Sequence, residues 1–245
     1  MVRNVDYESR RKAVLAATIN KYIKEAIPVS SEDMAGEFDL SSATIRNVFA
    51  DLEEGGYLTH PYTSGGRIPT KKGYRYYVDF LVSQMELLGE EKERILNEYR
   101  KEIKLLDEAL DKTSEIISLV THYAGIVSFI EWDDKFFYKG ISQILNHPEF
   151  QDFTKIRMLF KFIEDRKQLL SIINRDFHDS VKVYIGEELD CPEMQGCSLV
   201  VSRYRIRNKP LGRIAVLGPM RMEYNHIIPA LEYISEALSD FLSGI

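Results

Sequence analysis

Three closely spaced helix patterns, followed by a glycine pair, are the feature that most limits what this chain can fold into. Residues 7–27 place apolar side chains on one helical face, and Ser30 supplies a start signal for a second, shorter helix. Ser41 or Ser42 starts a third helix, which the pair Gly55–Gly56 stops. Because the last two helices are joined by a tight turn, the pattern predicts a helix-turn-helix.

The side chains on the exposed face of the third helix are unusual for a face that contacts only solvent. Its apolar side chains fall on one arc, made of Ile45, Val48, Phe49 and Leu52. The opposite face carries Ala43 and Ala50, and small side chains allow close approach to a duplex. A recognition helix contacts base edges and phosphates with its N-terminal end, where the candidate DNA-binding residues here are Ser42, Thr44, Arg46 and Asn47. The alternative is that the hydroxyl groups only cap the helix and that Arg46 only pairs with a nearby carboxylate such as Asp51.

Residues 57–69 predict a wing that follows this helix. Two short extended pieces, 57–59 and 67–69, flank a tip rich in Thr, Ser and Gly. Glycines let a backbone approach a phosphate, and Thr70 caps a further helix whose first turns are basic. The candidate DNA-binding residues of this region are Tyr62, Thr63, Ser64, Gly65, Gly66, Arg67, Lys71, Lys72 and Arg75. An ordinary hairpin with solvated lysines is the alternative, and it explains the glycines but not the clustering of donors.

The net charge of −6 argues at first against a protein that binds nucleic acid. The charge is unevenly distributed, since residues 1–77 hold 11 Lys and Arg against 10 Asp and Glu. Phosphate contacts are local and are screened within about 10 Å, so cations gathered on one surface are sufficient. An acidic chain of this kind can bind DNA if its few cations converge.

A seam of apolar residues, spaced alternately by three and four, begins at residue 96. Charged side chains fill most other positions between 90 and 112, as they do on the solvent-exposed faces of a coiled coil. The seam predicts either a homodimer interface or a long helix packed on its own chain, and the two can hold at different ends of one helix. The candidate dimerisation residues are Leu96, Tyr99, Ile103, Leu106, Leu110 and Ile117.

Helix and strand patterns alternate through the C-terminal part of the chain. Residues 154–165 predict a helix, residues 181–185, 199–206 and 213–217 predict strands, and Pro219 is expected to open a last helix. The predicted fold class is α+β, with a winged-helix DNA-binding domain at 1–80, a helical linker at 81–125, and an α+β regulatory or dimerisation domain at 126–245. Structural hydrogen bonds, rather than a ligand site, are expected of Glu187, Glu188, Arg221 and Tyr224.

Motif content excludes several other classes of protein. The two cysteines, Cys191 and Cys197, have no His or Cys partners at metal-ligand spacing, so we expect no metal, no cofactor and no disulfide framework. The five His residues stand in no nucleophile motif, so we expect no enzyme. No apolar stretch is long enough to span a membrane, and no secretory signal is found, so a cytoplasmic protein is expected. The rival to DNA binding is a ligand-sensing or protein-interaction module that uses the winged helix for docking.

Six segments, spread over more than half of the chain, carry a family resemblance. SSATIRNVFADLEEGGYL at 41–58 and PYTSGGRIPTKKGYRYYVDFL at 61–81 closely resemble the winged-helix domain of the heat-inducible transcription repressor HrcA family. The segments similar to the C-terminal half of that family lie at 146–165, 183–190, 197–204 and 212–224. The resemblance implies a GAF-like C-terminal domain. It also implies a repressor that binds an inverted repeat of double-stranded DNA as a homodimer, controls chaperone genes, is assisted by chaperonin, and is relieved by heat.

The chain also departs from the usual pattern of that family. Ser30 and Glu32 stand where the family usually has Gly and a basic residue, which removes one expected cation. In the wing, Tyr62 and Gly65 replace the usual His and Ala. Family members carry an inserted dimerisation domain, whereas residues 130–138 of this chain leave almost no room for one. The resemblance is therefore to a shortened member of the family.

Overall fold

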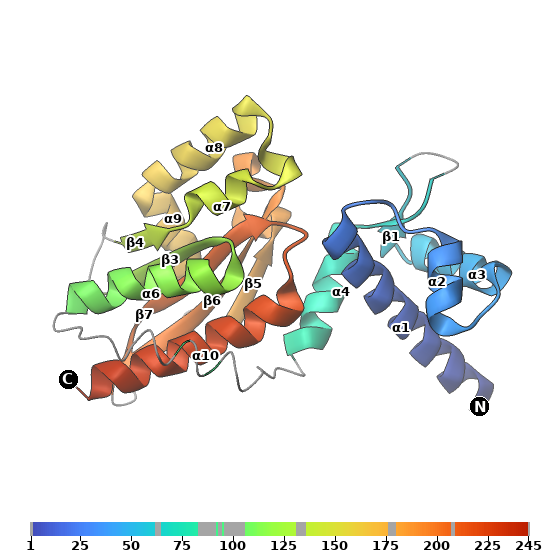
Figure 1. Cartoon of the computed structure of the whole chain (residues 1–245), viewed down its shortest axis with the longest axis horizontal. Helices are drawn as coiled ribbons and strands as arrows, with labels where there is room; N and C mark the ends of the chain where they lie inside the picture. The colour runs from blue at the N-terminus through green and yellow to red at the C-terminus, as the bar shows by residue number, and fades with distance from the viewer. Residues whose placement is uncertain are drawn as a thin grey trace. The chain divides into compact units, whose positions relative to one another are not determined.

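The structure is a computed structural model, and it describes residues 2–61, 65–82, 92, 95, 106–130, 136–175, 180–206 and 209–244. The chain forms two compact units, Met1–Ser83 and Gln84–Ile245. Figure 1 shows the helices and strands of each unit.

The N-terminal unit is a winged helix, as the sequence predicts. Its elements follow the order α1 (Val2–Glu25), α2 (Ser31–Phe38), α3 (Ser42–Glu54), β1 (Leu58–Thr59), β2 (Ile68–Pro69) and α4 (Lys71–Val82). The first helix stops where Ala26 adopts a positive φ of 56°, two residues before Pro28. The helix-turn-helix prediction is confirmed.

The turn between α2 and α3 is built from two helix caps. Ser30 accepts a hydrogen bond from the Asp33 backbone N–H at 3.1 Å, and the Asp33 carboxylate accepts one from the Ser30 backbone N–H at 2.9 Å, which completes a capping box. Asp39 ends α2 in the left-handed conformation, with φ of 53°. Ser41, rather than Ser42, is the N-cap of α3. These caps define where α2 begins and ends and where α3 begins.

The core of this unit joins all its helices. Ile19 and Ile23 of α1, Met34 of α2, Ile45 of α3 and Val78 of α4 are each at most 3% exposed. Burying a side chain of this kind stabilises a fold by about 1.5 to 3 kcal/mol. The apolar face predicted for α3 is confirmed, and its burial leaves the opposite face of the helix to solvent.

The second unit is an α+β domain around a five-stranded antiparallel sheet of order β4-β3-β7-β6-β5. Its strands are β3 (Ala124–Phe129), β4 (Phe136–Lys139), β5 (Val181–Ile185), β6 (Cys197–Ile206) and β7 (Lys209–Pro219). Its α-helices among the described residues are α6 (Leu106–Thr121), α7 (Ile141–Leu145), α8 (Phe153–Glu164), α9 (Arg166–Ile173) and α10 (Tyr224–Ser243). Three short 3-10 helices lie at Pro148–Phe150, Gly186–Leu189 and Pro192–Met194.

Both faces of this sheet are covered by helices, and every residue of β3 is buried. Ile126, Ala215 and Leu199 lie on one face, in the core formed with α7, α8 and α9. Side chains alternate along a strand, so Val127 and Val216 point to the other face, where α6 and α10 pack (Figure 1). The α+β prediction for this part of the chain is confirmed.

One expectation for this region needs correction. Pro219 does not open the last helix, because it ends β7 by pairing with Cys197, and α10 begins only at Tyr224. The helix Leu106–Thr121 lies within the predicted linker 81–125, and it packs on β3 and α10 of the second unit, as one of the two alternatives for the seam expects. Its apolar stripe is used within the chain, because a helix with one apolar face is stabilised when that face is covered.

Candidate nucleic-acid interface

The exposed face of α3 carries the side chains expected to read DNA. Ala43, Arg46, Asn47 and Ala50 are exposed. Ser42 and Thr44 are half-buried, and the Thr44 hydroxyl lies 2.8 Å from the Ser41 hydroxyl. The hydroxyl groups are therefore partly occupied by the helix cap, and Arg46 and Asn47 are the most accessible polar groups on this face among the described residues.

Arg46 makes an ion pair, but not with the carboxylate that the sequence suggests. Its Nη2 lies 3.2 Å from Oε1 of Glu32, and its Nε lies 3.4 Å from the Ser31 hydroxyl. Asp51 instead accepts a hydrogen bond from the Tyr7 hydroxyl. The Glu32 pKa is lowered by its own backbone N–H at the start of α2 and by Arg46, both of which favour the carboxylate. The charge of Arg46 is therefore partly compensated in the free protein.

The wing is a short antiparallel hairpin, with Leu58 opposite Pro69 and Thr59 opposite Ile68. A third piece of chain joins it, because Val29 and Arg67 exchange two backbone hydrogen bonds of 2.8 and 2.9 Å. Wing and α2 entry are thus one hydrogen-bonded unit. Residues 62–64, which include the candidate contacts Tyr62, Thr63 and Ser64, lie outside the described residues.

Close packing within the N-terminal unit requires a glycine at position 66. A Cβ at this position would lie 2.6 Å from the Val29 carbonyl oxygen and 2.7 Å from that of Pro28. The absent side chain therefore lets the wing approach the segment before α2. A role in approaching phosphate stays a prediction for Gly65 and Gly66.

Arg67 points toward carboxylate and carbonyl groups of its own unit. Its Nη2 lies 2.8 Å from Glu53, and its Nη1 donates to the Gly65 carbonyl at 3.2 Å. Glu53 also lies 2.6 Å from Nδ1 of His60, so one carboxylate at the end of α3 holds both arms of the wing. The side chains of Arg67 and Glu53 are only 25% and 22% exposed. Their pairing fixes the wing, and a phosphate contact by Arg67 stays a prediction.

Residues at the start of α4 also make contacts within the N-terminal unit. Thr70 accepts from the Gly73 backbone N–H at 3.1 Å, which confirms it as a cap. Lys72 donates to the Gly55 carbonyl at 2.7 Å and lies 4.5 Å from the centre of the Tyr57 ring. This places a cation at the C-terminal end of α3, where the helix dipole favours it. Arg75 pairs with Asp79 at 3.5 Å, and Lys71 is exposed.

One cleft brings the predicted residues of helix and wing together. It has a volume of about 260 Å³, and its lining includes Glu32, Arg46, Gly65, Gly66 and Arg67. The sequence pointed to Arg46 and the wing residues, but it did not identify Glu32 and Glu53 as the carboxylates that hold them. Glu32 could have been suspected, because it stands where a basic residue is usual, whereas the pairing of Glu53 with Arg67 spans 14 residues and has no local signal.

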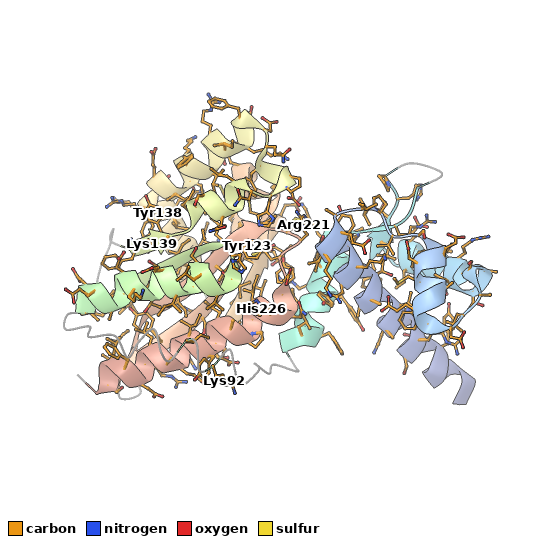
Figure 2. All side chains as sticks on the ribbon, in the orientation of Figure 1. Lys92, Tyr123, Tyr138, Lys139, Arg221 and His226 are labelled. Atoms are coloured by element: carbon orange, nitrogen blue, oxygen red, sulfur yellow. The ribbon has the colours of Figure 1, made fainter. Side chains whose placement is uncertain are left out.

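The candidate dimerisation seam divides into two parts. Leu96, Tyr99 and Ile103 lie outside the described residues, and Leu106 is half-buried. Leu110 and Ile117 are 0% exposed in the core of the second unit, so these two side chains cannot also contact a second copy. Ile95 is likewise buried, and the ammonium of Lys92 lies 5.6 Å from the ring centre of Tyr233 on α10 (Figure 2). In the described part of the seam, the apolar side chains therefore pack within the chain, as the second of the two alternatives predicts.

The bonds made by Arg221, Tyr224 and Glu188 stabilise the fold of the second unit. Arg221 and Glu149 form a two-point ion pair, in which Nη2 lies 3.3 Å from Oε2. The Tyr224 hydroxyl donates to the Met220 carbonyl at 2.7 Å, and the Glu188 carboxylate accepts from the Ile185 backbone N–H at 3.0 Å. The structural interpretation of these residues fits their contacts.

Tyr123, labelled with Arg221 in Figure 2, lies between α6 and β3. Its ring stacks on His147 with centroids 4.9 Å apart, and burial raises the Tyr123 pKa to about 12. Burial, and then the nearby Arg221 charge, lower the His147 pKa. Both rings therefore favour their neutral forms in the fold.

Two general observations apply to the part of the chain that the structure describes. No three His, Cys, Asp or Glu side chains there come together so as to hold a metal ion. No helix there combines the length and apolar character needed to cross a membrane.

Comparison with known proteins identifies the family. Residues 7–79 match the winged helix-turn-helix transcription repressor, HrcA DNA-binding family, and residues 128–228 match the HrcA protein C terminal domain. The chain belongs to the HrcA family. The HrcA N-terminal match covers α2, α3, the wing and most of α1 and α4, and therefore all of the described candidate interface.

Two curated relatives illustrate the match. The chain is 29% identical to the heat-inducible transcription repressor HrcA of Desulforudis audaxviator, over 97% of this chain and 98% of that protein. It is 29% identical to the protein of the same name from Geobacter sulfurreducens, over 98% and 99%. Both alignments extend over 339 positions, whereas this chain has 245 residues, so these HrcA proteins carry roughly 100 residues with no counterpart here.

One solved structure, described as a hypothetical protein, has the same fold. Its TM-score is 0.80 at 18% identity, and the match covers 96% of this chain and 98% of that one. In the present chain β3 and β4 pair directly, with only residues 130–135 between them. This short connection fits the expectation of a shortened HrcA family member.

Proposed function

We propose that this protein is a sequence-specific DNA-binding repressor that acts in the cytoplasm as a homodimer on an inverted-repeat operator. The observation that carries the proposal is the exposed N-terminal half of α3, where Arg46 and Asn47 stand beside a wing. A helix presented in this way enters the major groove, where Arg reads guanine and Asn reads adenine. Two copies would place two such helices in successive grooves.

Family membership supports a more specific role. Relatives carry the name heat-inducible transcription repressor, so we infer that the regulated genes encode heat-shock chaperones and that heating relieves repression. Chaperonin would then assist recovery of the DNA-binding state. This predicts that heating the protein lowers its operator affinity and that added chaperonin with ATP restores it, whereas an unaltered affinity after heating would contradict the regulatory part.

The homodimer must use surfaces other than Leu110 and Ile117, which are already buried. The seam residues Leu96, Tyr99 and Ile103 therefore stay as the candidate contacts. Light scattering of the full chain, alone and with an operator duplex, measures the stoichiometry. A monomer that binds one half-site without pairing would contradict the homodimer.

Binding to duplex DNA tests the central proposal. The operator is obtained by selection from a pool of random duplexes, and a scrambled duplex of the same composition serves as control. Arg46→Ala and Asn47→Ala should each weaken binding to the selected duplex by about 1 to 3 kcal/mol and relax its specificity. Lys72→Ala should weaken both duplexes alike and flatten the salt dependence.

Unchanged affinity in all three variants would remove the assignment. The rival function, a docking module without DNA affinity, predicts no enrichment from the pool and no salt dependence. Measurement at two salt concentrations therefore separates the two functions in one experiment.

A further inference from the structure

A carboxylate stands among the groups expected to meet DNA. Glu32, in the first turn of α2, and Arg46, in the first half of α3, form an ion pair with N–O distance 3.2 Å. Both side chains are 65% exposed and line the same cleft as Gly65 and Gly66 of the wing. A negative charge at this place opposes binding to a polyanion.

The first turn of α2 holds Arg46 through more than one contact. The Ser31 hydroxyl accepts from Nε of Arg46 at 3.4 Å and lies 3.2 Å from Oε2 of Glu32. The backbone N–H of Glu32 and the Arg46 charge keep the carboxyl in its ionised form by lowering its pKa. These contacts use Nε and Nη2, so Arg46 can contact DNA with its other N–H groups while it remains paired with Glu32.

The pair of Arg67 with Glu53 differs in exposure. Arg67 and Glu53 are 25% and 22% exposed, and Glu53 is shared with His60. That pair is part of the wing framework and is expected to persist in a complex. The exposed pair of Arg46 and Glu32 is the one that DNA can reach.

The consequence of this pair for binding depends on which groups the DNA presents to Arg46. An exposed arginine gains little by replacing a carboxylate with a single phosphate, because both are solvated ion pairs of similar strength. The released Glu32 carboxylate would also stand close to the phosphate backbone and be repelled by it. A correctly placed guanine instead offers two hydrogen-bond acceptors, which Arg46 can bind with its remaining N–H groups while Glu32 still holds it, and this contact discriminates strongly against the wrong base.

We propose that Glu32 is a specificity-determining residue of the DNA-binding surface. Through its ion pair with Arg46 it lowers affinity for duplexes of arbitrary sequence more than affinity for the operator. The proposal rests on the proposed function, since it requires that the protein discriminates between DNA sequences.

The experiment uses the full chain, the duplex selected from a random pool, and the scrambled duplex of the same composition. Glu32→Gln is compared with the wild type and with Glu37→Gln, an equal change of charge more than one turn further along α2 at an exposed position. Dissociation constants are measured at two salt concentrations. Glu32→Gln should tighten binding to the scrambled duplex by about 5- to 10-fold at 0.1 M salt, as expected for one added phosphate contact, and steepen its salt slope by about one.

Binding of Glu32→Gln to the selected duplex should tighten by less than about 3-fold, so the ratio of the two dissociation constants falls. Glu37→Gln should leave that ratio within about 2-fold of the wild type. In an Arg46→Ala background, Glu32→Gln should no longer change the ratio, because the carboxylate acts through Arg46.

Several results would overturn the proposal. Equal tightening on both duplexes, no change on either, or the same effect from Glu37→Gln would show that Glu32 contributes only bulk charge. A change of the ratio that persists without Arg46 would show that the ion pair is not the cause. These results refute this inference alone if the wild type discriminates between the duplexes, whereas a wild type that does not discriminate refutes the proposed function together with it.

Discussion

Replacing Gly66 with alanine should loosen the wing. The Cβ of Gly66→Ala would lie 2.6 Å from the Val29 carbonyl oxygen and 2.7 Å from the Pro28 carbonyl carbon and oxygen. These neighbours are backbone atoms, so a rotamer change cannot relieve the contact. The two strands must separate at the bridge between Val29 and Arg67.

The expected magnitude follows from what is lost at that bridge. Two backbone hydrogen bonds join Val29 and Arg67, and each contributes about 1 kcal/mol. Overpacking adds about 1 to 3 kcal/mol, and the reduced entropy of the unfolded alanine chain returns up to about 1 kcal/mol. The bridge should therefore be destabilised by about 2 to 5 kcal/mol, which corresponds to faster local opening by about 30- to 4,000-fold.

Hydrogen exchange of the full chain, followed by mass spectrometry, measures this opening. Peptides that contain the Val29 and Arg67 amides should exchange faster in Gly66→Ala. The matched control is Gly36→Ala, where the new Cβ meets nothing within 4 Å and lies in the exposed helix α2, so it should stabilise the unit by up to about 1 kcal/mol. Exchange of Gly66→Ala at the wild-type rate would refute the steric reasoning.

Two predictions concern the second unit. Because burial raises the folded-state pKa of Tyr123 to about 12, above the value near 10 of an unfolded tyrosine, its contribution to stability is complete below pH 10 and is lost as the pH rises toward 12. Tyr123→Phe should reduce this alkaline loss in denaturant unfolding at pH 9 and 11.5, and an equal loss in both proteins would contradict the assignment. Glu149→Gln should lower the free energy of unfolding by about 1 to 2 kcal/mol, because it breaks the half-buried ion pair with Arg221. The exposed Glu164→Gln should change it by less than about 0.5 kcal/mol, and equal effects of the two variants would count against a structural role for the pair.

The helices of the winged unit could be predicted because their signals are local. Capping residues such as Ser30 and the apolar period of α3 specify a helix within a few residues of sequence. The candidate surface was predictable to the same degree, since the side that remains exposed follows from the side that is buried. Arg46 and Asn47 are exposed as this reasoning expects.

Pairings between distant residues could not be predicted in the same way. The heptad spacing at Leu110 and Ile117 suits a coiled coil and a sheet-covering helix equally well, because periodicity identifies an apolar face but not its partner. The partners of Arg46 and Arg67 lie 14 residues away in each case, and only the tertiary fold brings them together. The close approach of Gly66 to residues 28–29 could not be predicted either, because nothing in the sequence around position 66 indicates that this segment crosses it.

The order of strands in the second unit has a consequence for the time course of its assembly. Neighbouring pairs β3–β4, β5–β6 and β6–β7 connect segments that are close along the chain, but β3 pairs with β7 through Phe129 and Gly212, which are separated by most of the unit. Closing such a loop has an entropic cost before its contacts form, and pairing over long separations slows folding. The sheet is therefore expected to form first as two parts, the hairpin β3–β4 and the three-stranded meander β5–β6–β7, and the joining of β3 to β7 is the slow step. A nascent chain cannot complete this unit until β7 has been synthesised.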